Sequence, residues 1–212
     1  MLQSFQKWWG RSPGWLGLSV GEHGMTLVEM SSGVGSDRPI CRWGATAWMA
    51  PASDPWANVM YLATQVKALQ HRQQIQAGRL AIGLPCHRVV LQTLHIDTHL
   101  PARDVRAHVA WAAGQALDLE WDAVSFDYRS ESIVDPQSGP SQDGRTVTWV
   151  ACPKSLVRAA HELSQAAGLK LHFLGVEPFP ETLSLTSYSP PDLEDSIQFQ
   201  VACEMAKQGA QA

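Results

Sequence analysis

A short segment near the start of the chain, bounded by glycines, carries residues suited to binding a phosphate group. Gly21-Glu22-His23-Gly24 joins two apolar runs, and Ser19 stands two positions before it. Because glycine reaches positive φ angles at little cost, the sequence predicts a tight hairpin here. The backbone N–H groups of such a turn can donate to phosphate oxygens. A plain hairpin without a ligand is the alternative.

Other residue types that could carry catalysis or bind a metal do not form a recognised motif. The sequence contains no GxxxxGK[ST] and no GxGxxG phosphate-binding segment. The spacing of Cys86, His87, His95 and His99 is not a standard zinc pattern, so we expect no metal site and no catalytic residue. Glu177 ends an expected strand, where α/β proteins place functional groups, although a salt bridge or a turn is an alternative role.

Composition and charge indicate a folded protein without a general affinity for nucleic acid. The chain has 212 residues, of which 45% are hydrophobic and 17% charged, and its formal net charge is -4. This length can bury a sizeable core, and the negative charge argues against broad binding of nucleic acid. Four widely spaced cysteines favour reduced thiols in a cytosolic protein. No apolar run approaches the ~20 residues that span a bilayer.

The first half of the chain predicts a sheet and one helix. Apolar runs bounded by glycine indicate strands, and the first three are expected to be antiparallel neighbours. Ser53 is expected to cap the helix. Strand 79–84 is apolar on both faces, which is typical of a central strand. The expected elements are strands 15–20, 25–30 and 40–48, helix 53–74 and strand 79–84.

The second half predicts further alternation of strands and helices. Small apolar residues recur along helix 101–117 and indicate close packing on a sheet. Residues 129–144 are polar and predict a hairpin loop, and the segment 178–192 has the proline and serine content of a linker. The expected elements are strands 88–97, 122–128, 145–151 and 170–176, helices 101–117 and 153–167, and a final helix that begins after residue 192.

This order predicts a mixed α/β fold in two subdomains. The core subdomain comprises residues 15–84 and 170–207, the inserted subdomain comprises residues 85–169, and residues 1–14 and 208–212 are tails. Most of the nine tryptophans fall on apolar faces, so we expect them in the core. Trp8 and Trp9 lie outside that core and would suit a partner or a membrane surface.

Several segments, in the right order, resemble the PilM family, the actin-like cytoplasmic proteins of type IV pilus assembly. They cover roughly residues 15 to 179, and their order along the chain is part of the resemblance. The matching segments are Leu16-Gly-Leu-Ser-Val-Gly21, Met25-Thr-Leu-Val-Glu-Met30, Leu80-Ala-Ile-Gly-Leu-Pro85, Val89-Val-Leu-Gln-Thr-Leu-His-Ile96, Val109-Ala-Trp-Ala-Ala-Gly-Gln115, Val124-Ser-Phe-Asp-Tyr128, Val147-Thr-Trp-Val-Ala-Cys-Pro-Lys154, Ala167-Gly-Leu-Lys170 and Gly175-Val-Glu-Pro-Phe179.

The resemblance implies an actin-like (ribonuclease H-like) first domain with a small inserted α/β subdomain. The family's second domain, which carries a second phosphate loop and the adenosine pocket, is expected to be absent. Ser19 replaces the family's first-strand acid, which organises Mg²⁺, and Glu204 stands where the family commonly has glycine. We therefore expect a degenerate phosphate hairpin that binds neither ATP nor Mg²⁺, formed by Ser19, Gly21, Glu22, His23 and Gly24.

The resemblance also implies a function. The expected protein is a non-catalytic scaffold of pilus or competence-type assembly, cytoplasmic and peripheral to the inner membrane, that docks the cytoplasmic tail of a PilN-like membrane protein. Family members bind that tail in a groove between subdomains, and the candidate groove residues here are Val89, Leu91, Val105, Val109, Ala112 and Ala113. The alternatives are an actin-like ATPase and a GspL-like component of type II secretion, whose transmembrane helix is not found in this sequence.

Overall fold

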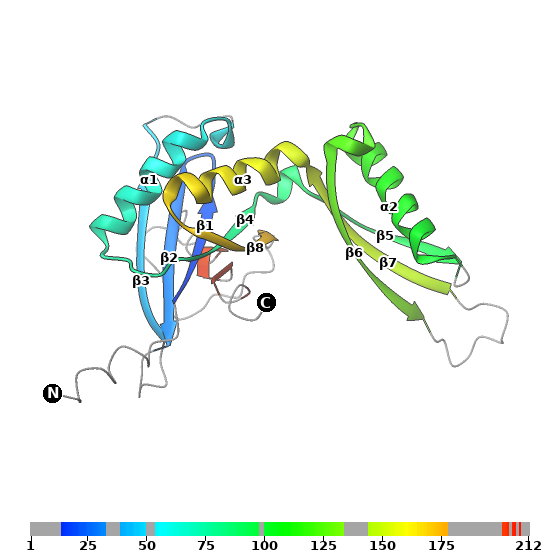
Figure 1. Cartoon of the computed structure of the whole chain (residues 1–212), viewed down its shortest axis with the longest axis horizontal. Coiled ribbons are helices and arrows are strands. Elements are labelled where there is room, and N and C mark those ends of the chain that lie inside the picture. Colours follow the sequence, from blue (N-terminus) through cyan, green and yellow to red (C-terminus); the bar gives the residue numbers. More distant parts are fainter. Residues whose placement is uncertain are drawn as a thin grey trace. The chain divides into compact units, whose positions relative to one another are not determined.

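The computed structural model describes residues 14–32, 39–49, 54–97, 100–133 and 144–177, with residues 201–203, 205, 206 and 208. Several features expected from the sequence lie outside these residues: Ser53, His99, Glu204, the linker over 178–192, and nearly all of both tails, with Trp8 and Trp9. Contacts divide the chain into two units (Figure 1). Unit 1 comprises Met1–Cys86 and Ala159–Ala212, and unit 2 comprises His87–Arg158.

Unit 1 is built on a five-stranded sheet in the order β3-β2-β1-β4-β8. Its first three strands are antiparallel neighbours, as the sequence predicts, and β4 runs parallel to both β1 and β8. The expected central position of β4 is also confirmed, because all but its first residue are buried. The strands are β1 (Trp15–Val20), β2 (Gly24–Ser32), β3 (Pro39–Ala47), β4 (Arg79–Leu84) and β8 (Lys170–Val176).

The helix expected over residues 53–74 is two elements. A short 3-10 helix, η1 (Pro55–Ala57), precedes α1 (Val59–Arg72). Asp54 caps the first and Asn58 caps the second, through carboxylate and amide oxygens that accept from backbone N–H groups. The break follows from Asn58, whose side chain satisfies the N–H groups at a helix start and so begins a new helix there.

Helical segments cover both faces of the unit 1 sheet. Leu69 of α1 lies 3.1 Å from the position of a Cβ at Gly44, on the face to which Leu27 points. The helical residues after 200 lie against the other face, where Ala202 packs on Val28. A Cβ at Gly17 would lie 1.7 Å from the Ala202 carbonyl oxygen, so only glycine permits this approach.

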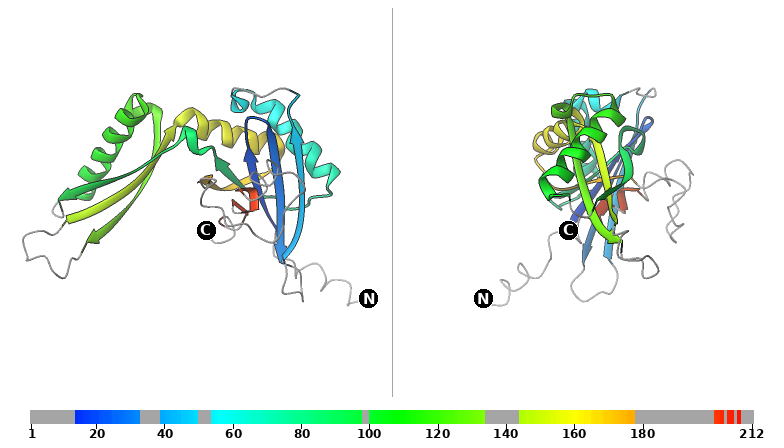
Figure 2. Two further views of the ribbon diagram at one scale, coloured as in Figure 1. Left: turned by 180° about the vertical axis from the view of Figure 1, so that it is seen from behind. Right: turned by 90° about the vertical axis from the view of Figure 1, so that its right-hand side faces the viewer.

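Unit 2 is a three-stranded antiparallel sheet with a helix along one face (Figures 1 and 2). The strand order is β5-β7-β6, and helix α2 follows β5 in the chain. The core between helix and sheet contains Val105, Val109, Ala113, Val124, Val147, Trp149 and Ala151. The elements are η2 (Cys86–Arg88), β5 (Val90–Asp97), α2 (Ala102–Leu117), η3 (Trp121–Ala123), β6 (Val124–Ile133) and β7 (Gly144–Pro153).

Helix α3 (Lys154–Ala167) crosses from one unit to the other. The sequence predicts an inserted subdomain over residues 85–169, whereas residue contacts assign the chain to unit 1 again from Ala159. Ala160 and Leu163 are fully buried in this second half of the helix. The strands and helices on either side of α3 otherwise follow the expected order, including β8 over 170–176.

The tryptophans do not all behave as expected. Trp56 and Trp149 are buried, but Trp111 and Trp121 are 67% and 70% exposed. Trp111 lies on α2 away from its buried stripe, and Trp121 lies in η3. Trp43 is also exposed, at 39%, and Trp15 and Trp48 are half-buried, so the prediction that most tryptophans lie in the core is wrong for the described residues. Among the described helices, none is long and apolar enough to cross a membrane.

Candidate functional site

The hairpin between β1 and β2 is held against the residue that follows β3. The Gly21 N–H donates to the Gly24 carbonyl at 2.8 Å. Trp48 donates twice, from its backbone N–H to the His23 carbonyl at 2.8 Å and from its indole N–H to the Gly21 carbonyl at 3.0 Å. The Gly21 N–H is therefore used within the hairpin and is not free to bind a phosphate. Glu22 and His23 are exposed at the tip of the hairpin.

The reason for glycine in this hairpin differs from the expected one. Gly168 is the only glycine with positive φ in the part of the chain that the structure describes. At Gly24, a Cβ would lie 2.3 Å from the Thr46 carbonyl oxygen on β3. Gly24 is therefore required by the close approach of a neighbouring strand, and the expected positive φ is wrong.

Ser19 and Glu177 meet beside this hairpin, although they are 158 positions apart. Ser19 is buried in β1, and its hydroxyl donates to Glu177 Oε1 at 2.8 Å. The Glu177 N–H donates to the Leu84 carbonyl at 2.8 Å, which fixes the residue at the ends of β4 and β8. A Cβ at Gly83 would lie 2.7 Å from Glu177 Cγ, so the glycine makes room for the acid.

Burial changes the protonation of this acid. It raises the pKa of Glu177 from its ordinary value of 4.5 to about 7, against the lowering effects of the Ser19 hydroxyl and a backbone hydrogen bond at Val20. Near neutral pH the carboxyl is therefore about half neutral. The neutral Ser19 hydroxyl is a weaker ligand for Mg²⁺ than the carboxylate that the family resemblance implies in its place. No cluster of three or more His, Cys, Asp or Glu placed for a metal occurs among the described residues.

The residues Gly17-Leu-Ser-Val-Gly21 also spell the GxSxG pattern of serine hydrolases. In those enzymes the serine lies at a sharp turn from a strand into a helix, where its hydroxyl is exposed. Here Ser19 is 2% exposed within β1, and the strand continues into a hairpin. Ser19 therefore does not form a nucleophile elbow, and the pattern does not indicate a serine hydrolase here.

A second buried acid in unit 1 has a structural role. Glu29 accepts from the backbone N–H groups of Gln76 and Ala77 and forms an ion pair with Arg42 at 3.6 Å. These contacts attach β2 to the segment between α1 and β4. Glu29 stabilises the fold, whereas Glu177 has Ser19 as its side-chain partner among the described residues, at the ends of β4 and β8.

The expected partner-binding residues belong mostly to the core of unit 2. Val105, Val109 and Ala113 are at most 1% exposed. Ala112 packs against the same core, and Val89, just before β5, is half-buried. Leu91 on β5 differs, because its side chain is 58% exposed. In this structure Leu91 alone among the six presents a large exposed surface to a partner.

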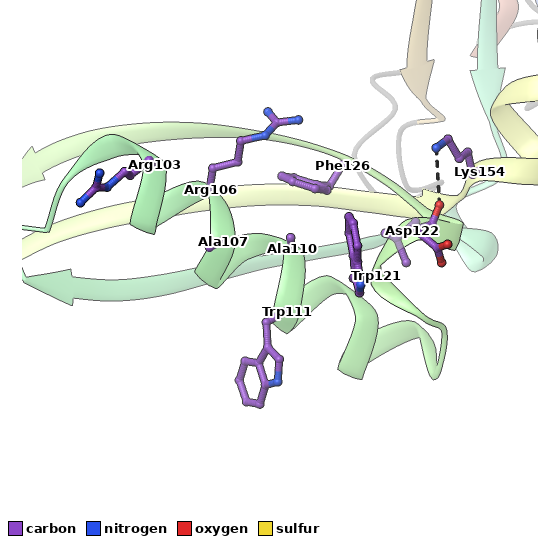
Figure 3. A pocket seen from close by; sticks show the side chains of 10 residues that line it. Arg103, Arg106, Ala107, Ala110, Trp111, Trp121, Asp122, Phe126 and Lys154 are labelled. Atoms are coloured by element: carbon purple, nitrogen blue, oxygen red, sulfur yellow. Dashed lines mark hydrogen bonds between the residues drawn. The ribbon is translucent and has the colours of Figure 1, made fainter.

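A groove on unit 2 was not foreseen from the sequence (Figure 3). It has a volume of about 710 Å³ and lies between the outer face of α2, η3 and the start of β6. A tryptophan opposite the buried valines of α2 is the local signal that could have indicated it. The lining residues are Arg103, Arg106, Ala107, Ala110, Trp111, Trp121, Asp122, Val124, Phe126 and Lys154.

Comparison with known proteins gives one family and several similar folds. Residues 17–203 match the family described as type IV pilus assembly protein PilM. A solved PilM-PilN type IV pilus biogenesis complex aligns with 78% of this chain at 21% identity and a TM-score of 0.58. The chain spans 48% of that solved chain. None of the curated proteins compared with it matches.

Two more distant structures also align. The cytoplasmic domain of EpsL, an inner-membrane component of type II secretion in Vibrio cholerae, has a TM-score of 0.47 at 12% identity, over 79% of this chain and 60% of that one. Thermus thermophilus RuvC has a TM-score of 0.35 at 13% identity, over 93% and 96%. The actin-like (ribonuclease H-like) fold class expected from the sequence is confirmed.

Proposed function

Because the chain belongs to the family of the type IV pilus assembly protein PilM, we propose that it is a non-catalytic scaffold of a pilus-type assembly. It binds the short cytoplasmic tail of a PilN-like protein of the inner membrane. It thereby lies at the cytoplasmic face of that membrane and is held there by its partner. Pilus, competence and secretion machines all fit this role.

The pairing of Ser19 with Glu177 carries the non-catalytic part of the proposal. Actin-like ATPases use ionised acids beside this hairpin to organise Mg²⁺, as the family resemblance implies. Here the Ser19 hydroxyl donates to Glu177 at 2.8 Å, and burial raises the pKa of that acid to about 7. The Gly21 N–H is already bonded to the Gly24 carbonyl. These contacts support a hairpin that holds no nucleotide with its magnesium ion.

The docking part rests on family membership. The solved complex contains PilM together with PilN. A membrane protein's extended tail can bind through its backbone and a few side-chain pockets, which needs no chemistry from the scaffold. Leu91 is the expected groove residue best placed for such contact, because it is exposed and flanked on β5 by residues that are mostly exposed.

Titration with a synthetic peptide of the PilN-like tail tests this proposal. The readout is the anisotropy of a dye on the peptide. We expect saturable binding to the full chain and at least about tenfold weaker binding to Leu91→Asp, because a buried unpaired carboxylate is costly. Met60→Asp is the matched control, since Met60 is 68% exposed on α1 of unit 1. If the folded protein does not bind the tail peptide, the proposed docking role is wrong.

A further inference from the structure

The groove on unit 2 combines exposed aromatic rings with a concave surface. Trp121 is 70% exposed, and Phe126 of β6 packs only partly into the core below. Trp111 is 67% exposed at the rim, where Figure 3 shows its ring projecting from α2 in the direction opposite to Arg106. Large aromatic side chains in a hollow are typical of surfaces that bind another molecule.

Small residues keep the groove open. Ala107 and Ala110 lie on the outer face of α2, and both line the groove. Val105 and Val109 point the other way, into the core. On the α2 side, the groove is therefore formed by side chains outside the buried core, and a ligand backbone can approach the helix closely at the two alanines.

Two cations in the groove have no acidic partner among the described residues. The Arg106 guanidinium lies 5.0 Å from the centre of the Phe126 ring, and Lys154 donates to the Asp122 carbonyl oxygen at 3.4 Å. Arg103, by contrast, forms an ion pair with Asp104 at 3.4 Å. The lining contains three cations and one acid, although the whole chain has a net charge of -4. This local excess favours an anionic ligand.

We propose that this groove binds an acidic peptide segment that carries a large apolar side chain. The apolar side chain lies on Trp121 and Phe126, and the peptide's carboxylates face Arg106 and Lys154. A hollow of about 710 Å³ suits a side chain better than a flat membrane surface. The carboxylates of Asp104 and Asp122 disfavour the continuous negative charge of nucleic acid. This site goes beyond the tail-docking role proposed above and does not depend on it.

Fluorescence anisotropy with a defined probe tests the proposal on the full chain. The probe is a dye-labelled peptide of alternating glutamate and phenylalanine, and the comparison peptide has glutamine in place of glutamate. We expect saturable binding of the acidic probe that weakens with added salt, and at least about tenfold weaker binding of the glutamine peptide.

Three variants locate the site. Arg106→Glu reverses the charge, and Ala107→Trp fills the groove at an exposed position. We expect each of these two substitutions to weaken binding of the acidic probe at least about tenfold. Lys67→Glu, at an exposed position of α1 in unit 1, makes the same charge change outside the groove and is expected to leave binding within about twofold.

The proposal is wrong if the acidic probe does not bind, or if Lys67→Glu weakens it as much as Arg106→Glu does. It is also wrong if the chain instead co-floats with anionic phospholipid vesicles in a manner that Ala107→Trp abolishes, because the groove would then be a lipid site. Circular dichroism of each variant confirms folding, and a groove variant that does not fold is replaced by Lys154→Glu, at an exposed position.

Discussion

The hairpin site of unit 1 and the groove of unit 2 differ in how their polar groups are satisfied. Ser19 and Glu177 are bonded to each other, and a Cβ at Gly83 would lie only 2.7 Å from Glu177 Cγ. In the groove, Arg106 and Lys154 have no carboxylate partner among the described residues, and Trp121 is exposed. A closed set of contacts stabilises a fold, whereas an open set is available to a ligand. The comparison therefore predicts that substitutions at the close contacts of unit 1 change stability and that substitutions in the groove change binding.

Within unit 1, the largest effect on stability is expected at Gly17. A methyl group there would overlap the Ala202 carbonyl oxygen and lie 2.8 Å from the Ala206 nitrogen, so β1 and the last helical segment must separate. We expect Gly17→Ala to lower the free energy of unfolding by at least about 2 kcal/mol, measured by urea denaturation. Gly78→Ala is the control, because a Cβ there meets nothing within 4 Å. Equal losses for the two variants would mean that unit 1 is not closed in this way.

The next effect is a pH dependence that Glu177 imposes on stability. Its pKa is raised from 4.5 to about 7 in the folded chain, so the native state holds more protons than the unfolded state in that window. Stability should therefore fall as the pH rises from about 4.5 to 7, by at most about 3 kcal/mol from this group. Denaturation at several pH values should show this fall in wild type and its reduction in Glu177→Gln. A stability that rises equally in both proteins would contradict the raised pKa.

A smaller effect is expected at Ser19. The Ser19→Ala variant removes the hydroxyl that donates to Glu177, and that hydrogen bond lowers the pKa of the acid. We expect the pKa of Glu177 to rise further and the free energy of unfolding above pH 7 to fall by about 1 to 2 kcal/mol. Carbon-detected NMR of the Glu177 carboxyl measures the titration directly. An unchanged midpoint would show that the hydroxyl does not interact with the acid.

The smallest effect on stability is expected in the groove. Trp121→Ala removes an exposed ring, so the free energy of unfolding should change by no more than about 0.5 kcal/mol. Trp149→Ala removes a ring that is 1% exposed in the core of the same unit, and it should cost about 3 to 5 kcal/mol. Thermal unfolding of both variants gives the contrast. A large loss for Trp121→Ala would mean that this ring supports the fold and is not part of an open site.

The sequence predicts most of the fold because its signals are local. Strand β1 has the expected bounds, since a glycine-bounded apolar run defines both of its ends. The division of helix 53–74 was missed because Pro55 and Asn58 offer two starts, and periodicity does not choose between them. Regular spacing identified Val105 and Val109 as one face of α2. The spacing does not indicate whether this face packs on the protein's own core or on a partner, and in the structure Trp149 covers it.

The sites were less predictable because they depend on residues distant in the chain. Ser19 and Glu177 were each noted, but their hydrogen bond joins positions 158 apart and follows from the pairing of β4 with β1 and β8. The groove joins α2 to η3 and to Lys154, a residue from the start of another helix. Only Trp111, on the outer face of an amphipathic helix, gave a local indication of it.

The most direct test of the non-catalytic account is isothermal titration of the full chain with Mg-ATP, together with amide hydrogen exchange of the Gly21–Gly24 hairpin. Because Ser19 occupies the place of an acid and its hydroxyl is bonded to Glu177, we predict no saturable heat at millimolar nucleotide and unchanged exchange in the hairpin. Saturable binding with slower exchange at Gly21 and Gly24 would contradict the account and make the chain a nucleotide-binding member of its family.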